Sequence, residues 1–140
     1  MATESHFTQF TVEYGDCDPA QIVFYPNFFR WMDAASLHFF AGAGVPPWHK
    51  RDAGDGVIGT PVVDAQATFM QTATYGDRLE IETSIVEWRN TSFVMRHVIR
   101  RGATVIAEGQ EVRIFARRHP DDPHRLLPVP PPADIRRHFD

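Results

Sequence analysis

Residues 26–43 read PNFFRWMDAASLHFFAGA, and this stretch decides the fold class. Its apolar residues recur at helical spacing, which predicts a long helix from Asn27 to Ala43 with an aromatic buried face. Pro26 suits the first turn of that helix, because the N–H that a proline lacks would have no partner there. Two glycines and a Pro-Pro pair within residues 42–47 predict where the helix ends.

Segments with the alternation of β-strands flank this helix. One strand is predicted before it, at Phe7–Tyr14. Four more are predicted after it, at Val57–Ala73, Arg78–Trp88, Ser92–Arg101 and Thr104–Arg117. Short connections between them suit antiparallel hairpins. One segregated helix beside a run of strands indicates an α+β fold, in which the helix covers one face of a curved antiparallel sheet. The other face, or an edge, is then available for a second subunit.

The rest of the chain is predicted to be loop and tail. The polar stretch Lys50–Gly56 is interpreted as a loop. The tail from His119 holds six of the 11 prolines. It is interpreted as a strap ordered on the surface or as a partly disordered segment, with room for a short helix at Ala133–Phe139. A length of 140 residues fits a single domain spanning residues 1–140.

Composition excludes several classes of protein. An apolar fraction of 43% indicates a globular chain, and a net charge of −4 disfavours a nucleic-acid-binding role. Cys17 is the single cysteine, so an internal disulfide is excluded and a reducing compartment is favoured. The N-terminus has no signal-peptide pattern, and no apolar run is long enough for a transmembrane helix. We therefore expect a cytoplasmic protein without membrane association.

The stretch from Tyr14 to Asn27, YGDCDPAQIVFYPN, places two carboxylates and a thiol in a turn just before the predicted helix. A helix N-terminus presents unpaired N–H groups and the positive end of the helix dipole. This arrangement could polarise a carbonyl group while a nearby carboxylate attacks it or activates water. From spacing alone, however, turn formation is the stronger interpretation of Asp16 and Asp18.

The amino-acid sequence of the same stretch closely resembles that of the 4-hydroxybenzoyl-CoA thioesterase family of hot-dog proteins. The resemblance is carried by YGDCDPAxIVFYPNF at 14–28 and RWMDAAS at 30–36. It continues through GVPPW at 44–48, GTP at 59–61, EWR at 87–89, SFV at 92–94 and RH at 96–97, covering the chain to about residue 118. It implies a hot-dog fold, in which a curved antiparallel sheet wraps a long central helix. It also implies a homodimer, paired into a dimer of dimers, with active sites between subunits.

The resemblance further implies roles for five residues. Asp18 falls on the family's catalytic carboxylate, which acts on the thioester carbonyl as nucleophile or general base. The backbone N–H of Tyr25 falls on the group that binds the developing oxyanion. Asp33 falls on the residue that contacts the 4-hydroxyl of the acyl group, and Thr60 on one that lines the thioester pocket from the other subunit. Arg89 lies in the region that contacts the CoA nucleotide. The implied activity is hydrolysis of a hydroxylated aromatic acyl-CoA, without metal or added cofactor.

Two departures from the family pattern affect these expectations. Gln21 replaces the family's common glycine, and glutamine enters positive φ less readily, so a slightly different turn is expected. The Gln21 side chain is also a candidate to orient a water or to touch the substrate. The run Arg89-Asn90-Thr91 is less basic than in the family, which weakens the expected contact with CoA phosphates.

Several nearby residues have structural interpretations. Asp16 is expected to shape the turn by accepting backbone N–H groups. Cys17 has no linked histidine and is interpreted as a buried residue rather than a nucleophile. Asp33 lies three residues after Arg30, so a surface ion pair competes with a ligand role. His97 is expected to face inward with its hydrogen bonds satisfied. Two alternative functions stay open: a thioesterase for short or medium aliphatic acyl-CoA, and a non-catalytic acyl-CoA binding module.

Overall fold

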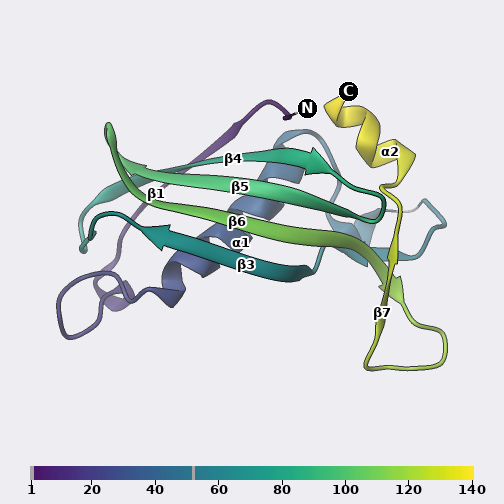
Figure 1. Ribbon diagram of the computed structural model, residues 1–140, viewed down its shortest axis with the longest axis horizontal. Helices are drawn as coiled ribbons and strands as arrows, with labels where there is room; N and C mark the ends of the chain where they lie inside the picture. The colour runs from purple at the N-terminus through teal and green to yellow at the C-terminus, as the bar shows by residue number, and fades with distance from the viewer. Residues whose placement is uncertain (1, 52) are drawn as a thin grey trace.

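The long helix α1 (Pro26–Gly42) lies across one face of a curved antiparallel sheet, as Figure 1 shows. This computed structural model describes residues 2–51 and 53–140. Met1 and Asp52, the second of which belongs to the predicted Lys50–Gly56 loop, lie outside the described residues.

The sheet has seven strands, and all of their pairings are antiparallel. Across the sheet, four strands lie side by side in the order β1 (His6–Thr11), β4 (Arg78–Trp88), β5 (Ser92–Arg101) and β6 (Thr104–Arg118). Three further strands pair with β6: β2 (Val57–Gly59), β3 (Val62–Phe69) and β7 (Leu126–Val129). The short helical segments are η1 (Tyr14–Asp16), η2 (Trp48–Lys50), α2 (Ala133–Arg136) and η3 (Arg137–Phe139).

This architecture confirms the predicted α+β hot-dog fold. The predictions for β4 and β5 are correct at both ends. The single strand predicted at Val57–Ala73 is wrong, because two strands form there with Thr60 and Pro61 between them. Proline has no N–H to donate to a ladder, which favours a break at that point.

The two ends of the chain also differ from expectation. The first strand stops at Thr11 rather than Tyr14, because Glu13 begins the capped turn η1. Of the two alternatives for the tail, the ordered strap is confirmed, because β7 pairs with β6 and is followed by α2 and η3. Ile135 of α2 is buried, which anchors this end of the chain against the core.

The core consists of two apolar clusters, one along each half of α1. The first contains Phe28, Met32 and Ala35 of the helix. The second contains Phe39 and Phe40. These buried residues agree with the aromatic buried face that the helical spacing predicted. The opposite face of α1, including Asp33, is exposed.

Candidate functional site

Asp18 lies in a tight loop whose two arms pair with each other. Cys17 and Val23 form an antiparallel bridge, and the Asp18 N–H donates to the Ile22 carbonyl at 3.0 Å. The Val23 N–H donates to the carbonyl of Ala73 at 2.8 Å. These bonds fix the loop to the end of the sheet and hold Asp18 in one place.

The Asp18 carboxylate is held by one oxygen and free at the other. Its Oδ1 accepts a hydrogen bond from the Ala20 N–H at 2.8 Å. Its Oδ2 has no hydrogen-bond partner among residues 2–51 and 53–140. The residue is partly exposed and lines a cleft of about 390 Å³. The cleft is lined by Tyr14, Gly15, Cys17, Asp18, Pro19, Gln21 and Tyr75. One carboxylate oxygen is therefore oriented by the main chain while the other stays available for chemistry.

The start of α1 is tied to the same loop. The Phe24 N–H donates to the Asp16 carbonyl at 2.9 Å, and the Asn27 side chain donates to that carbonyl at 2.8 Å. Between them, the backbone N–H of Tyr25 has no partner within the part of the chain that is described. Pro26 follows and has no N–H to offer. Tyr25 therefore presents a free donor at the positive end of a 17-residue helix.

Gln21 closes the loop in a left-handed conformation. Its φ is 66°, and among the described residues it is the one non-glycine with positive φ. Its N–H donates to the Asp18 carbonyl at 2.8 Å, and its own carbonyl accepts from the Thr74 hydroxyl at 2.6 Å. The main chain thus keeps a turn that disfavours glutamine by about 1–2 kcal/mol. Gln21 is among the residues that line the Asp18 cleft, and its expected contact with a water or the substrate stays a prediction.

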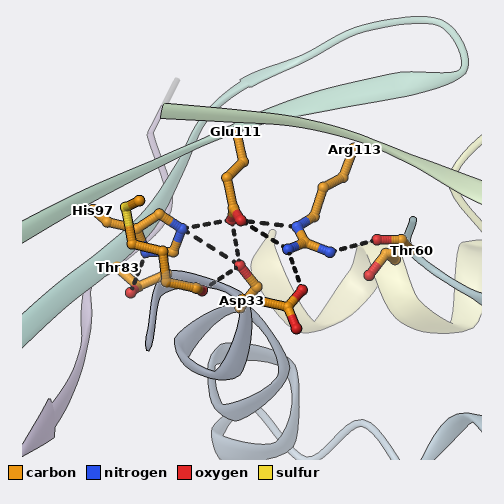
Figure 2. A network of polar contacts seen from close by, with 8 residues as sticks. Asp33, Thr60, Thr83, His97, Glu111 and Arg113 are labelled. Carbon is orange, nitrogen blue, oxygen red and sulfur yellow. Dashed lines mark hydrogen bonds and ion pairs between the residues drawn. The ribbon is translucent and has the colours of Figure 1, made fainter. Parts of the chain in front are cut away.

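Asp33 and Thr60 are brought together by Arg113, a residue that the sequence analysis missed. Arg113 donates through Nη2 to Asp33 Oδ1 at 2.8 Å and through Nη1 to the Thr60 carbonyl at 2.7 Å (Figure 2). The competing interpretation of Asp33, a surface pair with Arg30, is wrong: the ion pair of Asp33 is with Arg113, and Arg30 instead donates to the Asn27 side chain at 2.9 Å.

Arg89 lies apart from these groups, in the turn between β4 and β5. Its guanidinium forms an ion pair with Glu87, and both side chains are about half exposed. Its N–H donates to the Ser92 carbonyl at 2.8 Å. The Arg89 side chain is therefore paired with the end of β4, and Arg89 is not among the residues that line the Asp18 cleft.

The structural interpretations of Asp16 and His97 are confirmed, whereas Cys17 is only partly buried and its lack of a nucleophilic role stays a prediction. Asp16 accepts the Glu13 N–H at 2.8 Å through its side chain and so shapes the turn. Cys17 is partly buried, with its sulfur 3.9 Å from the Glu13 carbonyl. His97 is fully buried and contacts the Thr83 hydroxyl at 2.9 Å and a Glu111 oxygen at 2.6 Å.

Comparison with known proteins places this chain among thioesterases. The family model of the thioesterase-like superfamily matches residues 12–139. A 4-hydroxybenzoyl-CoA thioesterase of Pseudomonas sp. (strain CBS-3) is 44% identical over 128 residues, which are 88% of this chain and 89% of that protein.

Solved structures agree with that match. The crystal structure of a 4-hydroxybenzoyl-CoA thioesterase variant in complex with 4-hydroxybenzoyl-CoA has a TM-score of 0.88 at 42% identity, covering 98% of this chain and 99% of that one. A gentisyl-coenzyme A thioesterase has a TM-score of 0.80 at 34% identity, covering 94% and 99%. In the described part of the chain, no helix is long and apolar enough to cross a membrane.

Proposed function

This chain belongs to the thioesterase-like superfamily, and we propose that it hydrolyses a hydroxylated aromatic acyl-CoA, such as 4-hydroxybenzoyl-CoA, to the free acid and CoA. That it is a thioester hydrolase follows from its family and from its 44% identity to a named enzyme. The observation that carries the proposal is that one short segment holds both an Asp18 carboxylate with one unbonded oxygen and a Tyr25 N–H without a partner in the described chain.

Asp18 acts on the thioester carbonyl carbon as nucleophile or as general base. As nucleophile, its Oδ2 bonds to that carbon, CoA leaves as thiolate, and water then hydrolyses the resulting anhydride. As base, it takes a proton from the water that attacks. Both routes place negative charge on the carbonyl oxygen, where the Tyr25 N–H and the helix dipole stabilise it. A thioester is a reactive electrophile with a good leaving group, so the proposed reaction uses neither a metal nor a cofactor beyond the CoA of its substrate.

Asp33 recognises the hydroxyl at the far end of the acyl group. It lies eight residues beyond Tyr25, which corresponds to about 12 Å along a helix axis. An aromatic ring with a carbonyl at one end and a para hydroxyl at the other suits that separation, with a hydrogen bond at each end. Asp33 Oδ1 is taken by Arg113, and the other oxygen is left to accept the hydroxyl.

A second copy of the chain completes the proposed site. The Asp18 cleft, at about 390 Å³, lies at the small end of ligand pockets and suits the acyl end of the substrate. Strand β3 pairs only with β6 in the described chain, and Val62, Val63 and Phe69 on it are exposed. Two copies related through this edge would bring Thr60 of one toward the thioester bound by the other. Arg89 contributes a cation for the CoA phosphates.

The test of the proposed chemistry is thiol release by Asp18→Asn. We expect the rate with 4-hydroxybenzoyl-CoA to fall at least a hundredfold, because the amide is neither nucleophile nor base. Asp121→Asn, in the exposed loop between β6 and β7, serves as the matched control and should keep the parent rate. Activity of Asp18→Asn within a few-fold of the parent would exclude the catalytic role. Oxygen-isotope incorporation into Asp18 during a single turnover separates the nucleophilic route from base catalysis.

The acyl specificity is tested with 4-hydroxybenzoyl-CoA, benzoyl-CoA and hexanoyl-CoA. Asp33→Ala should weaken hydrolysis of the hydroxylated substrate and leave the other two nearly unchanged. An equal loss with all three substrates would contradict the contact between Asp33 and the hydroxyl. A parent enzyme that prefers hexanoyl-CoA would instead favour an aliphatic substrate.

A further inference from the structure

A belt of polar side chains crosses the core between the two apolar clusters. It comes from four elements at one level along α1, and its residues all lie at or below 5% exposure. They are Ser36 of α1, Thr83 of β4, His97 of β5, and Glu111 and Arg113 of β6. Figure 2 shows the side chains of Thr83, His97, Glu111 and Arg113 converging between the helix and the sheet. Buried charges of this kind rarely add stability over apolar residues of similar size, so stability alone does not account for the belt.

Glu111 is the fixed negative centre of the belt. Its Oε1 accepts from Ser36 at 2.6 Å and from His97 Nε2 at 2.6 Å, while Arg113 donates to both of its oxygens. Burial alone would raise the pKa of Glu111, but hydrogen bonds from His97 and Arg113 outweigh it and lower the pKa to about 2. Both oxygens of Glu111 are thus engaged within the protein.

Arg113 links the buried carboxylate of Glu111 to Asp33 on the exposed face of α1. Its guanidinium donates to Glu111 at 3.3 Å through Nε and at 2.8 Å through Nη2, which fixes the plane of the group. Nη2 also donates to Asp33, and Nη1 donates to the Thr60 carbonyl. The Arg113 side chain is 6% exposed, whereas the Asp33 side chain is 71% exposed. The arginine is therefore anchored from inside, and Asp33 is held against it from outside.

We propose that Arg113 is a positioning residue for acyl recognition: fixed to Glu111 and to the Thr60 carbonyl, it holds the Asp33 carboxylate in the geometry that accepts a phenolic hydroxyl. An aspartate on an exposed helix face would otherwise sample several rotamers in water. By occupying Oδ1, Arg113 directs Oδ2 away from itself and toward the ligand. The inference rests on the proposed function, in which Asp33 binds the hydroxyl.

A lysine could not replace this arginine. Arg113 contacts a carboxylate, a second carboxylate and a carbonyl in three directions through one planar group. An ammonium group is a compact point charge on a flexible stem, so it cannot hold these partners in one plane. The selectivity for a hydroxyl should therefore depend on the shape of the guanidinium and not only on its charge.

The experiment measures kcat/KM for 4-hydroxybenzoyl-CoA divided by kcat/KM for benzoyl-CoA. Asp33→Ala should lower this ratio roughly tenfold, the size expected for losing one hydrogen bond to a charged group. Arg113→Lys and Arg113→Met should each lower it several-fold. In the Asp33→Ala background, the same Arg113 substitutions should change the ratio by less than about twofold, because Arg113 acts through Asp33.

Arg51→Met is the matched control. Arg51 is also an almost fully buried arginine side chain with two carboxylate partners, Asp55 at 2.6 Å and Asp134 at 2.7 Å. Its loss should lower stability without changing the ratio. Urea unfolding of every variant identifies those that fold, and Arg113→Lys keeps a cation beside Glu111 if Arg113→Met does not fold.

A binding measurement separates failure of this inference from failure of the proposed function. Calorimetry with non-hydrolysable thioether analogues, with and without the para hydroxyl, gives an affinity ratio that needs no turnover. If the parent hydrolyses neither thioester, the proposed function fails, while a ratio lowered by Arg113→Lys still supports the positioning role. Folded Arg113 variants that keep the parent ratio would overturn the inference. So would an equal fall in the ratio with and without the Asp33 carboxylate.

Discussion

Gly109 of β6 and Met32 of α1 lie in close contact between the sheet and the helix, because a Cβ at Gly109 would overlap the sulfur of Met32. Both residues are buried, and Gly109 lies opposite His97 in the ladder between β5 and β6. The absence of a side chain at Gly109 lets this part of α1 pack closely against β6. The depth of the helix in turn fixes where Ser36 meets Glu111.

Gly109→Ala should therefore destabilise the protein by about 1–3 kcal/mol through overpacking. Urea unfolding measures the change. Replacing Met32 as well, in the double variant Gly109→Ala/Met32→Ala, should cost less than the sum of the two single substitutions, since the new methyl group then has space. Additive losses would show that the close approach is not the cause.

Gln21→Gly should stabilise the protein by about 0.5–1 kcal/mol. Glycine removes the backbone strain of a glutamine at positive φ. The greater conformational freedom of glycine in the unfolded chain offsets part of this gain. Gln71→Gly is the matched control: Gln71 is also exposed and does not have positive φ, so glycine there should destabilise. Chemical unfolding compares the two, and a loss of stability in Gln21→Gly would contradict the assignment of strain to this turn.

Much of the fold was predictable because it depends on periodicity. The helix and the two central strands have unbroken patterns, and their bounds were found to within a residue or two. The break at Thr60–Pro61 was missed because a run of β-branched residues outweighed the proline, although that proline was the available signal.

The site was predictable only where it is local in sequence. Asp18 and Tyr25 lie in one short segment, and a turn followed by a helix start is visible there. Arg113 pairs with Asp33 across 80 residues, a contact that no spacing rule predicts. One signal did exist, because Glu111 and Arg113 share the strand face of buried Phe115, and alternation therefore places both charges inward.

Asn27→Ala should lower turnover in a protein that still folds. The Asn27 side chain donates to the Asp16 carbonyl at 2.8 Å and so ties the first turn of α1 to the loop that carries Asp18. The substitution removes this bond and the bond from Arg30 to Asn27 Oδ1, while the Asp16 carbonyl keeps the Phe24 N–H, so the expected loss of stability is about 1–2 kcal/mol. The looser alignment should lower kcat roughly tenfold with little change in KM. Asn90→Ala, in the exposed turn after β4, should leave kcat unchanged.

Glu111 should make stability depend on pH in the acid range. Hydrogen bonds from His97 and Arg113, acting against burial, lower its folded-state pKa from 4.5 to about 2. A lowered pKa stabilises the folded state above the unfolded value, so this contribution is present above about pH 4.5 and is lost as pH falls toward 2. The full contribution is on the order of 3 kcal/mol. Urea unfolding at pH values from 6 to about 3 should show a flatter profile for Glu111→Gln than for the parent. Glu108→Gln, at a partly exposed position on the same strand, should keep the parent profile, and equal slopes in all three proteins would exclude Glu111 as the source.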